Sequence, residues 1–137
     1  MSTPITPVPG PDLAAQFAYL ETTGRTTGKP HEIEIWFAGE TDDDGDAGRL
    51  YLMAGGRDRA DWVKNVRRTP RVRIRIAGRW YAGTARVIEG EAGEVRARSL
   101  VCAKYMHYDP ARNTELPPGW CREALPVAIM LDPIPTG

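Results

Sequence analysis

Strict alternation of apolar and charged side chains constrains the fold of this chain more than any other feature. In the segment RVRIRI at residues 71–76, every second residue is apolar and the residues between them are arginines. Residues 31–38 repeat the pattern, with Ile33, Ile35 and Phe37 on one face. A period of two is typical of a β-strand that buries one face and exposes the other. The chain is therefore expected to build a sheet.

The remaining segments alternate between strand-like and helical patterns, with turns between them. Strands joined by short turns predict antiparallel hairpins, and helices inserted between hairpins favour a closed or split barrel over a parallel sheet. The expected fold class is mainly β with α (α+β), built on six antiparallel strands. Strands are predicted from residue 19 and at 31–38, 49–54, 71–76, 80–89 and 124–131; helices are predicted at 57–68 and 91–105, with a short helical lead-in at 12–19 capped by Asp12.

Length and charge limit the classes of protein that fit. A chain of 137 residues predicts one domain, at 12–137, after a proline-rich tail at 1–11 that is expected to be flexible. The 18 basic and 18 acidic residues cancel, which argues against a general nucleic-acid-binding or membrane-surface protein. The chain has no apolar run long enough for a transmembrane helix, and its start lacks the apolar core of a secretory signal. A cytoplasmic protein is predicted.

Cysteine and histidine are both scarce. Cys102 and Cys121 are the only cysteines; one pair builds neither a zinc site nor a disulfide scaffold, so both are expected to be reduced cytosolic thiols. His31 and His107 are the only histidines, and no metal site or Ser-His-Asp set is readable from the spacing. A protein with so little acid–base equipment can still be an enzyme if a cofactor carries out the chemistry.

A basic, hydroxyl-rich loop between two predicted strands is the clearest candidate for ligand binding. Its glycines allow close backbone approach, and its threonines and cations can cradle a phosphate or a carboxylate. An ordinary hairpin loop with solvated charges is the alternative. Residues 57–79 are also rich in Arg and Lys, which gives a local basic field. The candidate contact residues in the loop are Arg25, Thr26, Thr27, Gly28 and Lys29.

Two motifs follow each other along the chain. The first is Thr-Thr-Gly-Arg with a further glycine, at Thr22, Thr23, Gly24, Arg25 and Gly28, and the second is Gly-Gly followed by Trp-x-x-Asn-x-x-x-x-Pro, at Gly55, Gly56, Trp62, Asn65 and Pro70. In this order and spacing they resemble the deazaflavin-dependent nitroreductase family, whose members use coenzyme F420. The resemblance covers roughly residues 18–132 and implies the split β-barrel of pyridoxamine phosphate oxidases and flavin reductases.

The resemblance also implies roles for individual residues. It places the phosphate and carboxylate tail of F420 on the loop, and it implies hydride transfer to a small molecule with an activated double bond, quinone or nitro group. Tyr105 and Tyr108 become substrate-side candidates, because a phenol can donate a proton or a hydrogen bond; packed aromatics are the alternative. The remaining cofactor-side residues implied are Met53, Ala54, Gly55, Gly56, Trp62 and Asn65.

Three positions depart from the family pattern, and other functions stay open. Many members carry Arg at the position of His31, Pro at Ala60 and Ser at Ala54. The same loop would serve an FMN-dependent reductase or a heme binder, because it suits any phosphate or carboxylate. A non-catalytic barrel that binds a lipid or another apolar ligand is a further alternative. The expected oligomeric state is a monomer or a homodimer.

Overall fold

A computed structural model describes residues 10–41 and 47–133 of the chain. The predicted tail therefore falls almost entirely outside the described residues, as does most of the turn predicted between residues 41 and 48. The elements are β1 (Ala18–Thr23), β2 (Pro30–Ile35), β3 (Ala38–Thr41), β4 (Ala47–Ala54), the 3-10 helix η1 (Arg57–Arg59), α1 (Asp61–Arg68), β5 (Arg71–Ile76), β6 (Arg79–Val87), α2 (Glu94–Tyr105), α3 (Trp120–Glu123) and β7 (Leu125–Leu131).

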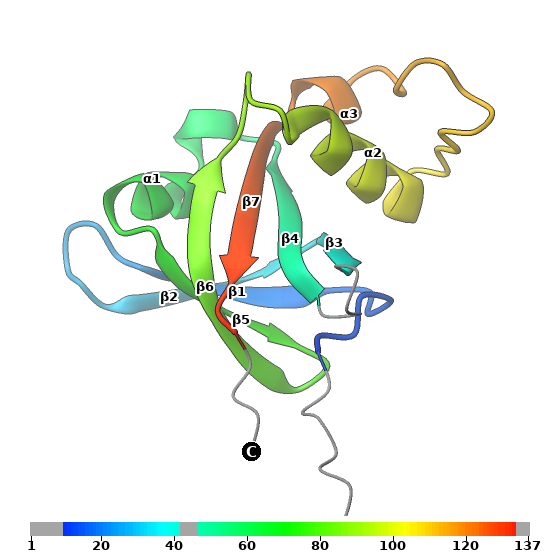
Figure 1. The fold of residues 1–137 in the computed structure, drawn as a ribbon. Helices are drawn as coiled ribbons and strands as arrows, with labels where there is room; N and C mark the ends of the chain where they lie inside the picture. Colours follow the sequence, from blue (N-terminus) through cyan, green and yellow to red (C-terminus); the bar gives the residue numbers. More distant parts are fainter. Residues whose placement is uncertain (1–9, 42–46, 134–137) are drawn as a thin grey trace, which may run out of the picture.

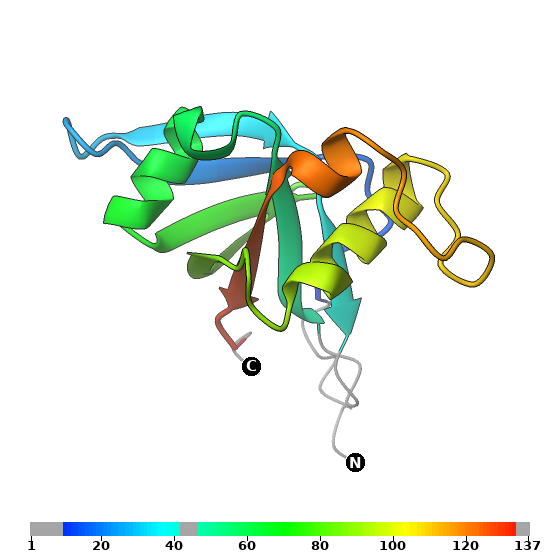
Figure 2. The same cartoon turned by 90° about the horizontal axis from the view of Figure 1, so that it is seen from above.

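The strands form one curled antiparallel sheet (Figure 1). Their order is β2-β1-β5-β6-β7-β4-β3, so β2 and β3 are the two edges. These edge strands are also neighbours in sequence, joined only by Trp36 and Phe37. A link of two residues brings the two edges together at one corner, and the sheet therefore curls into a half-barrel (Figure 2).

The sheet has seven strands in the described residues, where six were predicted. The difference lies at 31–38, which divides into β2 and the start of β3. Phe37 is completely buried, whereas the indole of Trp36 turns outward and stacks on the ring of Tyr105. The chain changes direction between these two side chains, although the alternating pattern of apolar residues continues through them.

The alternation in β5 has the predicted consequence. Val72, Ile74 and Ile76 are buried in the largest core cluster, inside the half-barrel, with side chains from β1, β4 and β7. A second core cluster lies on the outer face of the sheet, beneath α2, and includes Tyr51, Met53 and Val101. Helix α2 thus covers only part of that outer face.

The predicted helices differ from the observed ones at their starts. Residues 12–17 form turns, in which the Ala14 amide donates to Asp12 Oδ1 over 3.0 Å, and β1 begins at Ala18. The predicted helix at 57–68 divides at Ala60 into η1 and α1, and Asp58 pairs with Arg67 rather than capping α1. Helix α2 begins at residue 94 rather than 91. The short helix α3 was not predicted.

The two cysteines form a disulfide, which corrects the prediction of reduced thiols. Cys102 in α2 and Cys121 in α3 are both buried, with Cα atoms 6.2 Å apart. This distance lies within the range that a disulfide spans. Spacing along the chain could not reveal the pair, because α3 brings Cys121 back against α2. Since cytosolic thiols are normally reduced, the disulfide removes the thiol argument for a cytoplasmic location.

None of the helices in the described ranges is long and apolar enough to cross a membrane. Within the same ranges, no three His, Cys, Asp or Glu side chains are grouped to hold a metal ion.

Candidate cofactor site

The loop between β1 and β2 is a tight, internally bonded turn. The Gly24 amide donates to the Lys29 carbonyl over 2.7 Å, and the Gly28 amide donates back to the Gly24 carbonyl over 2.8 Å. Gly28 has a φ of +73°, a conformation that suits glycine. A side chain at Gly24 would lie 2.7 Å from the ring of His31. The loop backbone is therefore fixed, while the side chains of residues 26–29 are exposed to ligands.

Asn65 joins the two sequence motifs. Its side chain is buried, and its Nδ2 donates to Thr22 Oγ1 over 3.1 Å. Its Oδ1 accepts from the Arg25 amide over 3.2 Å and from Arg25 Nη1 over 3.0 Å. Helix α1 and the loop are therefore connected through one side chain. The asparagine of the second motif holds the first motif in place.

Arg25 is oriented by an ion pair as well as by Asn65. Its Nη2 lies 3.1 Å from Asp61 Oδ1. Asp61 is highly exposed, so this pair is screened and contributes little to stability. Its main effect is geometric, because the guanidinium of Arg25 is held at the wall of the cleft beside α1.

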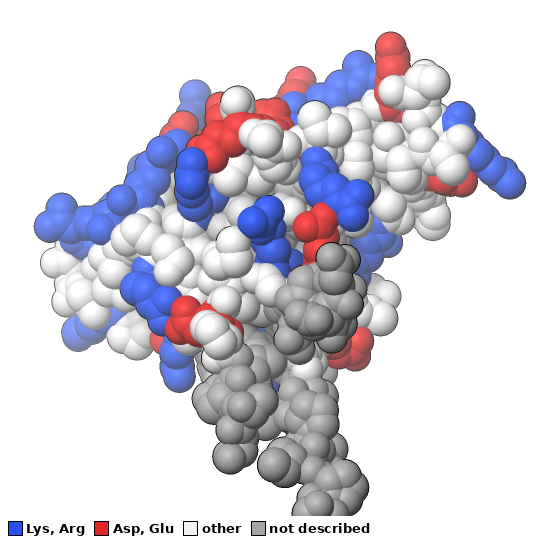
Figure 3. Space-filling view, viewed as in Figure 1, with Lys and Arg blue, Asp and Glu red and all other residues white. Residues whose placement is uncertain are grey.

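A cleft with a volume of about 360 Å³ lies between this loop, β2 and α1. Four of the predicted cofactor residues line it: Arg25, Thr26, Trp62 and Asn65. Thr27, Gly28 and Lys29 lie beyond it at the exposed tip of the loop. Lys and Arg side chains gather on the flank that carries the loop and α1 (Figure 3). Exposed basic residues of the loop, η1 and α1 are Lys29, Arg59, Lys64, Arg67 and Arg68.

A second hollow, of about 490 Å³, lies at the other end of β2 and is mainly aromatic and apolar. The Trp36 ring stacks on Tyr105 with centroids 4.5 Å apart, and the Trp120 ring meets Trp36 edge-on at 5.7 Å. Trp36 remains 39% exposed, which leaves part of the indole open to a ligand. The lining residues are Glu34, Ile35, Trp36, Met53, Met106 and Trp120.

The end of β4 supplies the small residues beside the aromatic hollow. Met53 and Ala54 are buried, and Gly55 and Gly56 follow them at the surface. A Cβ atom at Gly55 would lie 3.2 Å from Trp120 Nε1. Glycine therefore lets the indole of Trp120 approach the backbone, which brings α3 next to the second motif.

Strand β2 connects the two hollows. His31, Glu32 and Ile33 line the cleft beside the loop, and the next three residues line the aromatic hollow. The two volumes therefore follow one strand in direct succession. The surface that they make holds Arg25, two threonine hydroxyls and the carboxylates of Glu32 and Asp61 at one end, and mainly aromatic and apolar side chains at the other. We call this surface the β2 groove.

The two predicted catalytic tyrosines lie in different surroundings. The Tyr105 hydroxyl accepts from the Phe37 amide over 3.2 Å and donates to the Gln16 carbonyl over 2.9 Å, and burial raises its pKa. Its hydroxyl is thus committed to the backbone, while its ring supports Trp36. Tyr108 is half-buried on the segment after α2 and lines neither hollow. A proton-donating role for either tyrosine stays a prediction.

Several lining residues were not expected from sequence, among them Trp36, Trp120 and Asp61. Trp36 carried a signal, because it is a large aromatic on the polar face of an alternating strand. Trp120 and Asp61 carried none, since they enter the β2 groove only through the positions of α3 and α1.

A family model described as F420H(2)-dependent quinone reductase matches residues 9–118. The chain belongs to this family. As a member of the F420H(2)-dependent quinone reductase family it is a reductase that uses coenzyme F420, which confirms the cofactor and enzyme class predicted from the two motifs. No curated protein matches the chain.

Several solved structures share the fold. A proposed 5-nitroimidazole antibiotic resistance protein from Bacteroides thetaiotaomicron matches with a TM-score of 0.64 and 14% identity, over 88% of this chain and 75% of its own. An F420-H2 dependent reductase matches with a TM-score of 0.55 and 22% identity, over 84% and 93% of the two chains. The heme storage protein HutZ from Vibrio cholerae matches with a TM-score of 0.57 and 10% identity, over 87% and 83%. These likenesses support the split-barrel class.

Proposed function

We propose that the β2 groove binds F420 lengthwise and that the chain reduces a quinone, a nitro compound or an activated double bond held beside it. The observation that carries the proposal is the succession along one strand of a cleft rich in hydrogen-bond donors, flanked by exposed cations, and a mainly aromatic hollow. F420 has the matching division, with an anionic phosphate and carboxylate tail and a flat deazaflavin ring. When bound, the reduced coenzyme supplies the hydride.

The end beside the loop fits the tail by its donors. Thr26 and Lys29 are exposed at the loop, and Arg25 is already oriented at the cleft wall. Charge-assisted hydrogen bonds to phosphate or carboxylate are the stronger kind, at about 1.5–3 kcal/mol each. The exposed cations of α1 add a field that attracts an anion toward this end. Thr27 and Gly28 complete the proposed tail contacts.

The aromatic end fits the ring and the substrate by its shape. Met53 and Trp120, whose indole packs on the Gly55 backbone, supply apolar contact for the ring, and Trp36 supplies it for the substrate. Trp62 and Asn65 are on α1 and line the cleft proposed for the cofactor tail. An apolar lining favours a planar, weakly polar substrate and helps to exclude water, so that the reacting groups are held close together. We assign Tyr105 to holding Trp36 in the wall of this hollow.

The proposal is tested by following the oxidation of reduced F420 spectroscopically, with menadione and a nitroimidazole as separate acceptors. The wild type is expected to turn over at least one acceptor, and Trp36→Ala is expected to raise its KM with cofactor affinity retained. Absence of turnover with both acceptors would contradict the proposed reaction, and loss of cofactor affinity in Trp36→Ala would contradict the assignment of Trp36 to the substrate.

A further inference from the structure

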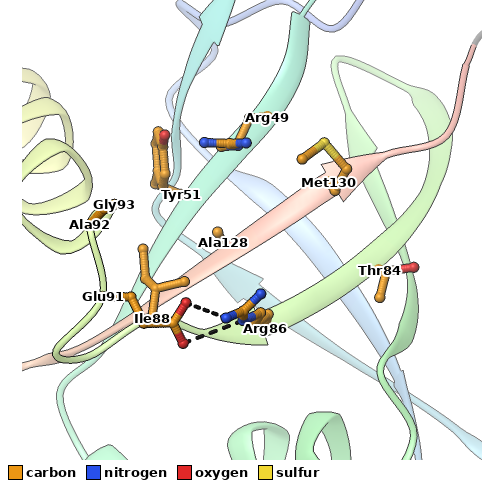
Figure 4. Close-up of a pocket in the computed structure, with 10 residues that line it drawn as sticks. All are labelled: Arg49, Tyr51, Thr84, Arg86, Ile88, Glu91, Ala92, Gly93, Ala128 and Met130. Atoms are coloured by element: carbon orange, nitrogen blue, oxygen red, sulfur yellow. Dashed lines mark hydrogen bonds and ion pairs between the residues drawn. The ribbon is translucent and has the colours of Figure 1, made fainter.

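A third hollow lies on the outer face of the sheet, on strands other than β2 (Figure 4). Its volume is about 280 Å³. It shares no lining residue with the β2 groove, and the proposed function leaves it unused. The lining residues are Arg49, Tyr51, Thr84, Arg86, Ile88, Glu91, Ala92, Gly93, Ala128 and Met130.

Strand register explains why a hollow forms at this place. Ala128 in β7 lies directly between Tyr51 in β4 and Arg86 in β6. A methyl group between two long side chains leaves space above the sheet. Ala92 and Gly93, on the turn before α2, form one wall of the hollow, and their side chains are also small. Three small residues from two parts of the chain therefore make the space.

The lining combines an apolar floor with a cationic rim. Met130, Ile88 and the Tyr51 ring supply apolar surface, while Arg49 and Arg86 approach from either side of Ala128. Arg86 directs Nε and Nη2 at the carboxylate of Glu91, with Nε 3.3 Å from Oε2. A guanidinium has five N–H donors, so this pairing leaves others for a ligand while fixing the plane of Arg86.

We propose that this hollow binds a small carboxylate with an aromatic or alkyl body. The lining holds two guanidiniums and one carboxylate, so the net charge favours an anionic head group. Arginine suits a carboxylate because its planar fork makes two parallel hydrogen bonds. The volume is slightly below the range of drug-sized ligands, about 300–1,000 Å³. A body of one or two rings, or a medium alkyl chain, therefore fits above Ala128.

The test is an amide NMR titration of the full chain with 1-naphthoate, repeated with the neutral analogue 1-naphthamide. Naphthoate is expected to shift the amides around Ala128 and Arg86, with the same affinity in the presence of saturating F420. Naphthamide is expected to bind about tenfold more weakly or worse, since the charged head group is lost. Naphthoate shifts confined to residues 24–36, or equal binding of the two probes, would overturn the proposal.

Variants separate the rim from the floor. Arg86→Gln is expected to weaken naphthoate binding about tenfold while leaving naphthamide binding unchanged. Arg79→Gln, on the same strand but outside the hollow, is the matched control and is expected to bind naphthoate as the wild type does. Ala128→Leu fills the space and is expected to abolish binding of both probes. Wild-type affinity for naphthoate in both Arg86→Gln and Ala128→Leu would refute the site.

Discussion

Asn65 carries more structural consequence than any other polar side chain of the site. Its three hydrogen bonds connect β1, the loop and α1. Because the side chain is buried, removing it leaves the Thr22 hydroxyl and the Arg25 amide without that partner, and unsatisfied buried groups are costly. The pairing of motifs that resembled a cofactor signature in the sequence thus has a structural basis in one contact network.

Asn65→Ala is expected to lower the free energy of unfolding by about 1–3 kcal/mol and to weaken F420 binding, because Arg25 loses its orientation. Urea denaturation and a fluorescence titration measure the two effects. Asn113→Ala, at an exposed position in the loop before α3, is the control and should change neither. Stability and affinity equal to those of the wild type would show that Asn65 does not organise the loop.

Lys104 is a half-buried cation near the end of α2. Its Nζ donates to the Leu13 and Phe37 carbonyls, each over 2.9 Å, and burial lowers its pKa from 10.5 to about 8. Because the pKa of Lys104 is lowered, the folded state releases this proton at a lower pH than the unfolded state does. Stability should therefore rise with pH between about 8 and 10.5, and the cost of the charge is fully present below pH 8.

Lys104→Met is expected to remove this contribution. The difference in unfolding free energy between the wild type and the variant should shift in favour of the wild type as pH rises from 7.5 to 10, measured by urea denaturation. Lys64→Met, on an exposed face, serves as control. A difference that is constant with pH would show that the folded and unfolded states bind this proton equally.

At the scale of elements, α3 is the piece whose position most affects the site. It begins with Trp120, which lines the aromatic hollow, and its next residue is bonded to α2 through the disulfide. Arg98 Nη1 adds a bond to the Cys121 carbonyl over 3.0 Å, and Arg57 bonds the Glu123 carbonyl. An element of four residues has little stability of its own, so these tethers place Trp120.

Removing the disulfide is expected to lower the free energy of unfolding by about 3 kcal/mol, the chain-entropy value for a closed loop of this size, where the two cysteines are 19 residues apart. Thermal unfolding with and without the reductant TCEP measures the effect. The double variant Cys102→Ala/Cys121→Ala should unfold at the lower temperature in both conditions. An unfolding temperature of the wild type that does not respond to full reduction would contradict a stabilising role.

The period of apolar residues predicted those strands in which one face is buried and the other exposed along their whole length. β5 is the clearest case, since each of its apolar residues is buried as expected. The break after Ile35 escaped prediction because the alternation continues through Trp36 and Phe37 while the chain crosses from one sheet edge to the other. Helix α3 and its disulfide escaped because four residues have no detectable period, and their pairing depends on tertiary contact.

The site residues also fall into those with a local sequence signal and those that depend on tertiary contact. The turn at 24–29 and the break at the glycines 55–56 were predictable, because backbone conformation is a local property; that these residues hold the cofactor stays a prediction. The contributions of Asp61, Trp36 and Trp120 depend on how α1, β2 and α3 meet, which the sequence alone does not reveal.

At the scale of the whole molecule, charge is neutral in sum and uneven in distribution. The cations of α1 and the loop lie on the flank of the cleft beside the loop, so attraction of the anionic tail should act over a distance. Raising the salt concentration from 50 to 500 mM should weaken F420 binding, because such fields are screened within about 10 Å at 0.1 M salt. Isothermal titration at several salt concentrations measures this. Salt-independent affinity would contradict the electrostatic part of the account.

The most direct test of the central claim is a fluorescence titration of F420, with FMN alongside, into the wild type and Arg25→Ala/Lys29→Ala. We expect saturable binding of F420 in preference to FMN. The double variant is expected to lose affinity by at least about tenfold, since each charge-assisted contact contributes about 1.5–3 kcal/mol. Arg79→Ala/Arg112→Ala, which removes two exposed charges elsewhere, should bind as the wild type does. Equal F420 affinity in all three proteins would show that the tail does not lie on the loop of the β2 groove.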